Sequence, residues 1–489
     1  MILTVDSGTS VTKVAIWERD GLAAVSGIPL ETQYPAPGWV EQDPSTWWAS
    51  VVSACGELRR RAPGAFGSVE AVSCTGARQT FALVGAHGRP AGPGIVWSDR
   101  RAGREAGEVA ARTGVEPGLP SAAGIVLDGA SVAAKVAWLA GHQKDGFEAA
   151  AWIMTPRDLV VWNLTGVVAT DPTMASRSGL YDGEGTVLEG LAGPAATKLP
   201  PVTPSGAVTG LLVAEAAATT GLPPGIPVVI GAGDRACEVL GAGASETRPM
   251  VSWGTTANVS VPVAVRPEPP PGVVASRAAD GGWLLEGGLS GAGSLIEWLS
   301  RLTGRTPEDL AVEARTSPPG ARGVVAAPWL DGARSPWWRP DAAAALVGLG
   351  PTHGPADVAR ALYESVAWEV ARGLGAMARR SPDGPPVVEL ALAGSGAATP
   401  VWLEALTGVT GLPASHRRSG QAASAGAARL AAGALGLDWE LDLLDPVESR
   451  IETDPERVRR YRRLGPRADS VAASVVDLDP APAEEPPCG

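Results

Sequence analysis

A short strand, a turn of small residues and a second strand occur twice in this chain of 489 residues. The first copy runs from Ile2 to Trp17 and turns at Gly8-Thr9-Ser10; the second runs from Met250 to Val261 and turns at Gly254-Thr255-Thr256. Apolar and β-branched residues on both sides of a glycine turn predict a β-hairpin. Because the two turns lie about half a chain apart, the repeat predicts two halves of similar fold that divide near residue 245.

Each half also contains an apolar strand that runs through a glycine turn into a helix. Ile226–Ile230 leads into Gly231-Ala232-Gly233-Asp234, and Val387–Ala393 leads into Gly394-Ser395-Gly396. Strand–turn–helix segments of this kind form ligand sites in α/β folds. The predicted fold class is therefore α/β.

Charge and cysteine content exclude several kinds of partner. Acidic residues outnumber Lys and Arg by 52 to 40, so the chain has no basic surplus to neutralise a nucleic-acid backbone. The N-terminus lacks the basic and apolar segments of a signal peptide, and no apolar run reaches the ~18–20 residues of a membrane span. The four cysteines are scattered, which fits a reducing compartment. We therefore expect a cytoplasmic protein without nucleic-acid or membrane partners.

The two hairpin turns are candidate phosphate sites. The chain has no GxxxxGK[ST] motif and no GxGxxG after its first strand, so a nucleotide would need another binding mode. Backbone N–H groups at Gly8-Thr9-Ser10 and Gly254-Thr255-Thr256 can approach phosphates closely, because their side chains are small. Asp6, at the end of the first strand, could hold a hydrated Mg²⁺ beside them. Taken singly, each turn could also be an ordinary turn.

Asp234 is the residue with the sharpest local pattern. It follows a fully apolar strand and stands in a glycine turn at the start of a helix. A carboxylate there can cap the helix, which is worth about 1 kcal/mol. It can instead be a general base that faces a cleft. The local pattern leaves both interpretations open.

Polar residues beside an aromatic follow two strands of the first half. Arg78-Gln79 comes after the strand at 69–74, and Trp97 with Asp99 comes after Ile95-Val96. Hydrogen-bonding groups with a flat aromatic face suit a polyhydroxylated ligand. The alternative is a salt-bridged surface loop.

Several motifs, in order over about residues 1–463, resemble those of the FGGY carbohydrate kinases. Val5–Lys13 is similar to the family's D-x-G-T-S-x-x-K phosphate hairpin, and Trp39–Trp48 to its W-x-E-Q-D-P-x-x-W-W. Gly231–Gly241 is similar to its G-x-x-D loop. Gly348-Leu349, seven residues and then Asp357–Glu364 resemble the C-terminal signature, and Gly394–Ala397 with Trp402 resembles the adenosine-side loop.

The resemblance implies two ribonuclease-H/actin-like domains with ATP and sugar in the cleft between them. The expected division is 1–244 for sugar binding and the catalytic base, 245–440 for ATP, and 441–489 for a helix and a disordered tail. Asp234 would be the base, and Asp6 would position Mg²⁺. The resemblance assigns phosphate and nucleotide contacts to Gly8, Thr9, Ser10, Lys13, Gly254, Thr255, Gly394, Ser395 and Gly396. The tail is expected to follow a surface helix at 457–463 and to begin at Gly465.

The sugar site departs from the family's usual patterns. Arg78-Gln79 replaces the Met-His of xylulokinases and the Arg-Glu of glycerol kinases, and Arg235 follows the expected base where they carry Asn or Gln. The hypothesis is an ATP-dependent kinase of a small sugar or polyol, with a ketopentose such as xylulose as its substrate. Arg78, Gln79, Trp97, Asp99, Asp234 and Arg235 are its expected sugar contacts.

Other readings of the same fold stay open. Glycerol, another polyol or an aldonate is the alternative substrate, and two arginines near the pocket would favour an acidic sugar. A non-catalytic regulator that binds sugar and nucleotide is the alternative from another class. The assembly state is open, with a homodimer as one candidate.

Overall fold

The computed structural model describes residues 1–116, 124–378 and 384–478. Its first half is built on a six-stranded sheet with the order β3-β2-β1-β5-β10-β9. β5 and β10 run parallel to β1, whereas β2, β3 and β9 each pair antiparallel with their neighbours. The strands are β1 (Ile2–Ser7), β2 (Val11–Glu18), β3 (Gly21–Pro29), β5 (Ala71–Gly76), β9 (Val208–Leu211) and β10 (Pro227–Gly233).

The second half is built on a seven-stranded sheet with the order β13-β14-β12-β11-β17-β18-β19. β17 and β18 run parallel to β11, and the remaining pairs are antiparallel. The strands are β11 (Met250–Trp253), β12 (Ala257–Val263), β13 (Val274–Arg277), β14 (Trp283–Leu289), β17 (Leu390–Ala393), β18 (Ala414–Arg417) and β19 (Val447–Ile451).

The two sheets share one topology, which confirms the two halves predicted from the repeated hairpin. Three antiparallel strands followed by two parallel ones give β3-β2-β1-β5-β10 in the first half and β14-β12-β11-β17-β18 in the second. The strand at Leu390–Ala393 therefore stands where β5 stands, and the structural counterpart of β10 is β18. The two strand–turn–helix segments found in the sequence belong to different positions of the common fold.

Helices pack on both sheets. Those of the first half are α1 (Ser45–Arg61), α2 (Pro63–Gly67), α3 (Gly103–Thr113), α4 (Val132–His142), α5 (Lys144–Ala149), α6 (Pro156–Thr165), α7 (Pro172–Ser178), α8 (Glu189–Ala192), η1 (Gly193–Lys198), α9 (Ala214–Thr220) and α10 (Asp234–Ala242). Those of the second are α11 (Gly293–Thr303), α12 (Pro307–Ala314), η2 (Ala321–Gly323), α13 (Pro355–Ala378), η3 (Ser395–Ala398), α14 (Pro400–Thr410), α15 (Ala422–Ala434), α16 (Leu441–Leu444) and α17 (Pro455–Val476). Short strands outside the main sheets are β4 (Glu41–Gln42), β6 (Ala82–Val84), β7 (Gly94–Ile95), β8 (Trp152–Met154), β15 (Val325–Ala327) and β16 (Ala345–Val347). None of the helices in these described ranges combines the length and the apolar character that a membrane crossing needs.

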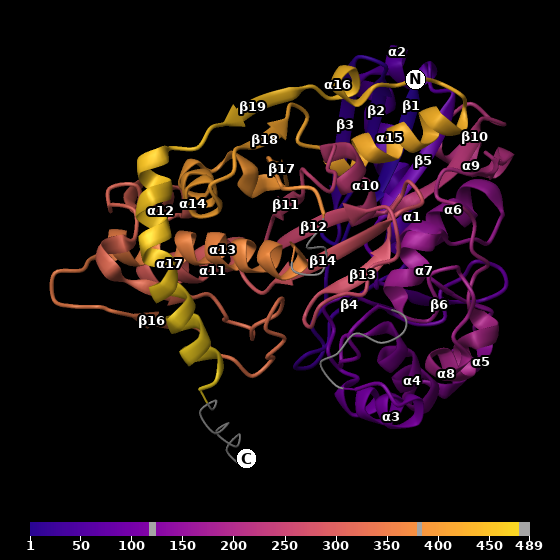
Figure 1. The fold of residues 1–489 in the computed structure, drawn as a ribbon. Coiled ribbons are helices and arrows are strands. Elements are labelled where there is room, and N and C mark those ends of the chain that lie inside the picture. The colour runs from indigo at the N-terminus through magenta and orange to yellow at the C-terminus, as the bar shows by residue number, and fades with distance from the viewer. Residues whose placement is uncertain (117–123, 379–383, 479–489) are drawn as a thin grey trace.

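Helices α10 and α15 pack against each other between the two sheets (Figure 1). Although α15 belongs to the second half by sequence, its alanines are buried with Ile2, Trp17 and Val229 of the first sheet. Ser424 of α15 bonds the hydroxyl of Thr4 at 2.6 Å and accepts the indole N–H of Trp17 at 2.8 Å. Glycines allow the close crossing, because a Cβ at Gly426 would lie 2.0 Å from the Cys237 carbonyl oxygen. The helix pair thus joins the two halves.

The C-terminal segment is more ordered than its composition predicts. The expected helix at 457–463 is part of α17, which continues to Val476. The expectation of disorder from Gly465 onward is therefore wrong for residues 465–476, and residues 479–489 lie outside the described part of the chain. Helix α17 is held because Ala472, Val475 and Val476 are buried against a cluster that includes Trp329. The Tyr461 hydroxyl, fully buried, donates to Glu364 at 2.6 Å, so this helix is only partly a surface helix.

Candidate active site

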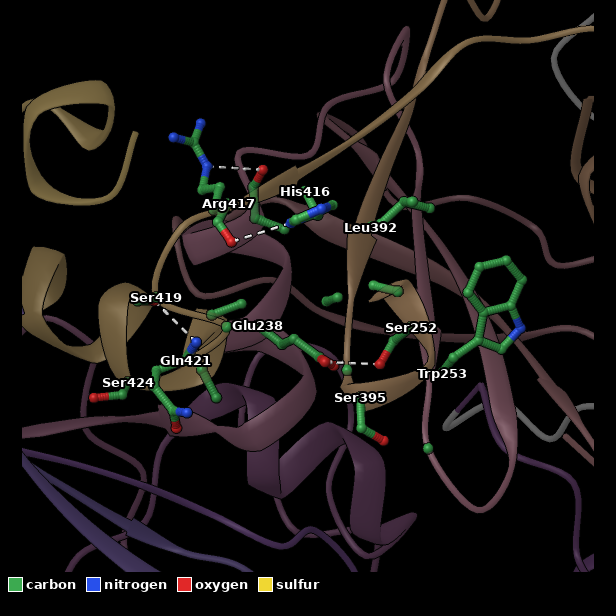
Figure 2. A pocket seen from close by; sticks show the side chains of 18 of the residues that line it. Glu238, Ser252, Trp253, Leu392, Ser395, His416, Arg417, Ser419, Gln421 and Ser424 are labelled. Atoms are coloured by element: carbon green, nitrogen blue, oxygen red, sulfur yellow. Dashed lines mark hydrogen bonds between the residues drawn. The ribbon is translucent and has the colours of Figure 1, made fainter. Parts of the chain in front are cut away.

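A cavity of about 780 Å³ lies where the two halves face each other (Figure 2). The first half lines it with the β1–β2 hairpin and the start of α10, and the second half lines it with its own hairpin and with the loops after β17 and β18. The residues predicted from sequence that line this cavity are Asp6, Gly8, Lys13, Asp234, Arg235, Gly254, Thr255, Gly394 and Ser395. The structure therefore brings both hairpin turns and the Gly394 loop to one place.

Glycine at 394 is required by its backbone. Its φ is +81°, and a Cβ there would lie 2.0 Å from the Trp253 carbonyl oxygen. Gly396, predicted in the same loop, is instead packed against Trp253 and Trp402 and is not among the lining residues. Thr9 and Ser10 also lie outside the lining: the Thr9 carbonyl accepts a hydrogen bond from Gln42 at 2.6 Å, and that of Ser10 accepts one from Leu30 at 2.8 Å.

Asp6 is half-buried at the edge of this cavity, and its Oδ1 atom is inaccessible to solvent. Within the described residues its Oδ1 atom has no hydrogen-bond partner. Burial, together with the nearby charges of Asp234 and Glu238, raises the pKa of Asp6 to about 7, although Lys13 acts in the opposite direction. A carboxylate that is costly to ionise and has a free oxygen gains from a cation beside it.

The carboxylate of Asp6 fits a Mg²⁺ ion that is also bound by the phosphates of a nucleotide. No group of three or more His, Cys, Asp or Glu side chains in the described ranges could hold a metal by itself. Mg²⁺ usually takes one or two carboxylates, keeps several waters and completes its shell with substrate phosphates. Asp6, with its unpartnered oxygen, could supply one such carboxylate.

In the metal-free protein, Asp6 is expected to make the free energy of unfolding fall as pH rises from about 4 to about 7. The folded carboxyl keeps its proton up to a pKa of about 7, against an ordinary value of 3.8. Its contribution is therefore fully present below the ordinary value and is lost as pH rises through the folded value. The shift sets an upper limit of about 4 kcal/mol on this loss.

Urea unfolding in EDTA at several pH values measures this slope. Asp6→Asn should remove the Asp6 part of it and make the metal-free protein more stable at pH 8. Asp20→Asn, an exposed substitution in the β2–β3 turn, is the matched control and should keep the wild-type slope. An unchanged slope in Asp6→Asn would contradict the assignment.

Asp234 stands at the start of helix α10, and the N-cap position itself belongs to Gly233. Its carboxylate accepts a hydrogen bond from the backbone N–H of Arg235 at 2.6 Å and lies 3.4 Å from Arg78 Nε. The side chain is 44% exposed, which leaves it accessible. Of the two interpretations of the sequence pattern, the structure therefore does not support the helix cap.

A second cavity of about 190 Å³ adjoins Asp234. Of the predicted sugar contacts it is lined by Arg78, Gln79, Trp97, Asp234 and Arg235. Asp234 and Arg235 line both cavities, so the smaller space meets the larger one at the candidate base. This arrangement places one carboxylate between two binding spaces.

Asp99, the remaining predicted sugar contact, does not line the smaller cavity. It is fully buried, lies 2.7 Å from the Arg101 guanidinium and accepts the backbone N–H of Val40 at 2.6 Å. The prediction of a sugar contact is thus not met by this geometry. The ion pair of the alternative, a salt-bridged surface loop, is present, and Arg101 also stacks on Trp39.

Both predicted arginines of the sugar site are paired with carboxylates. The Arg78 guanidinium donates two hydrogen bonds to Glu286 of the second half, at 2.8 and 2.6 Å. The charges of Arg78 and Arg177 and the hydrogen bond from Ser276 hold the pKa of Glu286 well below its usual range despite burial. Arg235 pairs with Glu238, and Glu238 also accepts a hydrogen bond from Ser252 at 2.7 Å.

Sequence reasoning missed several lining residues. In the smaller cavity these are Arg177, Asn258, Glu286, Arg334 and Trp338, and in the larger one they include Trp253 and the loop 416–424. That loop contains Ser419-Gly420-Gln421 between β18 and α15, so the strand–turn–helix pattern could have found it. Its Gln421 accepts a hydrogen bond from Lys13 at 3.2 Å, which joins the two halves across the larger cavity.

Comparison with known proteins assigns the chain to a family. A family model described as "FGGY family of carbohydrate kinases, N-terminal domain" matches residues 1–241, and the corresponding C-terminal model matches residues 250–435. The xylulose kinase of Escherichia coli strain K12 is 28% identical over 483 residues, which cover 96% of this chain and 97% of that protein. The glycerol kinase of Alkalilimnicola ehrlichii is 30% identical over 495 residues, which cover 96% of this chain and 98% of that protein.

Solved structures agree with this placement. A crystal structure of a xyloylose kinase from Brucella ovis superposes with a TM-score of 0.89 at 26% identity and covers 98% of this chain and 99% of that one. The gluconate kinase from Lactobacillus acidophilus shares the fold, with a TM-score of 0.87, 20% identity and 98% of both chains covered. The two matching halves, the shared cleft and the relatives agree: the chain belongs to the FGGY family of carbohydrate kinases and is an ATP-dependent phosphotransferase.

Proposed function

We propose that the chain transfers the γ-phosphoryl group of ATP, bound in the larger cavity, to a hydroxyl of a small sugar, polyol or aldonate in the smaller one. The observation that supports this most directly is that Asp234 lines both cavities. A base that accepts the hydroxyl proton must reach the nucleophile while the nucleophile faces the phosphate. Residues 1–244 supply the base, both halves line the sugar site, and residues 245–440 supply most of the ATP site.

Each residue of the larger cavity has a proposed task. Asp6 holds Mg²⁺, which when bound neutralises developing phosphate charge. Backbone N–H groups of the two hairpins, at Gly8 and Gly254-Thr255, orient the phosphates together with Lys13. Gly394 and Ser395 lie on the adenosine side. Phosphoryl transfer asks the protein mostly for positioning and electrostatic stabilisation, and this set of groups supplies both.

Contacts between the halves keep water away from the reacting phosphate. Arg78 with Glu286 and Lys13 with Gln421 each join one half to the other beside the site. Water would otherwise compete with the sugar hydroxyl for the γ-phosphoryl group. We also propose a cytoplasmic location, because Cys55, Cys74 and Cys237 are free and buried thiols.

ATP turnover with a panel of ketoses, polyols and aldonates tests the proposal. ADP release is expected to rise at least about tenfold over the ATPase background with one member of the panel, because binding of the substrate completes the site. The ketopentose hypothesis predicts xylulose, and the glycerol kinase relatives add glycerol to the panel. If no compound stimulates ADP release, the non-catalytic regulator becomes the better description.

A further inference from the structure

We propose that the substrate of this kinase carries a carboxylate, which binds between Arg177 and Arg334, so that the enzyme acts on sugar acids. The inference rests on the proposed function and narrows its substrate class. It starts from the charges around the smaller cavity. Four arginines line it, at 78, 177, 235 and 334, against two carboxylates, those of Asp234 and Glu286. The lining therefore has an excess of positive charge.

The carboxylates of this region are already engaged. Glu286 accepts two hydrogen bonds from Arg78 and a third from Ser276. Glu238, from the next turn of α10, neutralises Arg235. Asp234 lies 3.4 Å from Arg78 Nε. The arginines that the sequence singled out are thus paired, and they cannot account for an anion site.

Arg177 and Arg334 differ, because their guanidinium groups make no hydrogen bond and no ion pair with any residue in the described ranges. Burial, together with repulsion from Arg78 and Arg334, lowers the pKa of Arg177 to about 10, although the attraction of Glu286 acts in the opposite direction. Burial also lowers the pKa of Arg334, although Asp128 attracts it from beyond ion-pair distance. Uncompensated cations in a partly buried cavity are unfavourable until an anion binds.

Both arginines are held in place by the backbone around them. Arg177 lies on α7, whose N-cap Asp171 accepts the N–H of Thr173 at 3.0 Å. The backbone N–H of Arg334 donates to the Ser290 hydroxyl at 3.0 Å. One arginine comes from each half of the chain, so a bound carboxylate would also hold the halves together. A planar guanidinium matches a carboxylate with two parallel hydrogen bonds, and two such groups make the match specific.

The rest of the lining suits the polyol part of a sugar acid. Gln79 and Asn258 offer amide groups for hydroxyls, while Trp97 and Trp338 offer flat faces. In the reaction the bond between the γ-phosphorus and the ADP oxygen breaks and a bond to the sugar oxygen forms. Asp234 takes the hydroxyl proton, and the carboxylate is left unchanged. A sugar phosphate is the other anion that two arginines could hold.

Matched substrates separate these possibilities. We expect kcat/KM for an aldonate to exceed that of its alcohol by at least about tenfold, because the alcohol leaves two half-buried cations unpaired. Gluconate is compared with sorbitol, xylonate with xylitol and xylulose, and glucose 6-phosphate and xylulose 5-phosphate form a third arm. Preference for a neutral compound or for a phosphate would overturn the carboxylate assignment. Absence of turnover with every compound would contradict the proposed kinase function, and the binding arm below then decides the inference.

Direct binding without ATP provides that arm. Calorimetric titration of the wild-type protein should detect binding of gluconate or xylonate. The alcohol that corresponds to the bound acid, sorbitol or xylitol, should bind at least about tenfold more weakly. Equal affinity for acid and alcohol, or no affinity for either acid, would overturn the inference whatever the turnover assay shows.

Substitutions test the two residues. Arg177→Gln and Arg334→Gln should each raise KM for the acid about tenfold or more while changing KM for the alcohol by less than about twofold. Arg301→Gln, on the exposed side of α11, is the control and should leave both unchanged. Neither arginine forms an ion pair, so its substitution leaves no carboxylate unpaired. The melting temperatures of both variants should therefore equal or exceed that of the wild type. A parallel loss for acid and alcohol would assign the arginines a structural role and overturn the inference.

Discussion

Replacing Asp234 by Asn is expected to lower kcat by a factor on the order of 10²–10⁴ and to leave ATP binding nearly unchanged. The amide has the size of the carboxylate but cannot accept the hydroxyl proton. The carboxylate's neighbours are the Arg235 backbone N–H and Arg78, and Arg78 keeps its two hydrogen bonds to Glu286. The fold should therefore survive, and the loss should fall on the chemical step.

Single-turnover kinetics and nucleotide titration measure the two parts separately. Removing the Asp234 charge also lessens the repulsion that raises the pKa of Asp6, so binding of Mg²⁺ with ATP should not weaken. Asp20→Asn makes the same chemical change on the surface and serves as the control. A kcat of the Asn variant close to that of the wild type would end the general-base assignment.

Gly426→Ala is expected to destabilise the protein by about 3 kcal/mol, because the added methyl group has no space at the crossing of α10 and α15. A Cβ at residue 426 would lie 2.0 Å from the carbonyl oxygen of Cys237. On the facing helix, a Cβ at Gly241 would lie 1.9 Å from the carbonyl oxygen of Ala422. The nearest atoms are backbone, so relief requires the helices to separate. Since α10 begins at Asp234, the separation should also lower kcat.

Gly433→Ala provides the matched control on the same helix. No described atom lies within 4 Å of a Cβ at Gly433, and alanine favours a helix over glycine by up to about 1 kcal/mol. Urea unfolding should therefore show the two substitutions moving stability in opposite directions. Equal effects would mean that α10 and α15 are not in close contact in solution.

The parts of the site that the sequence predicted are those carried by local pattern. The hairpins at Gly8 and Gly254 and the turn before Asp234 each combine strand periodicity with glycine, and such signals need no knowledge of the partner segment. Their assembly into one cleft followed from the repeat. Asp99 failed because an ion pair to Arg101 two residues away uses its oxygens, and local sequence does not show which way a side chain points.

The residues that escaped prediction depend on contacts between distant segments. Arg177 and Arg334 lie 157 positions apart and meet only at the smaller cavity, and neither stands in a motif. Glu286 is placed at the site by its hydrogen bonds with Arg78, which lies in the other half. The tail was misjudged for a similar reason: Ala472 and Val475 read as part of a low-complexity end until Trp329 is seen to cover them.

The burial of α15 on the first sheet has a consequence for synthesis on the ribosome. The strands β1, β5 and β10 are complete once Gly233 has been made, yet the alanines that cover them begin at Ala425. At about 5–20 residues per second, the apolar face of a nearly finished sheet waits roughly 10–40 s for its cover. A nascent chain of this enzyme should therefore require protection by a chaperone during that interval, and a fragment released at residue 244 should aggregate.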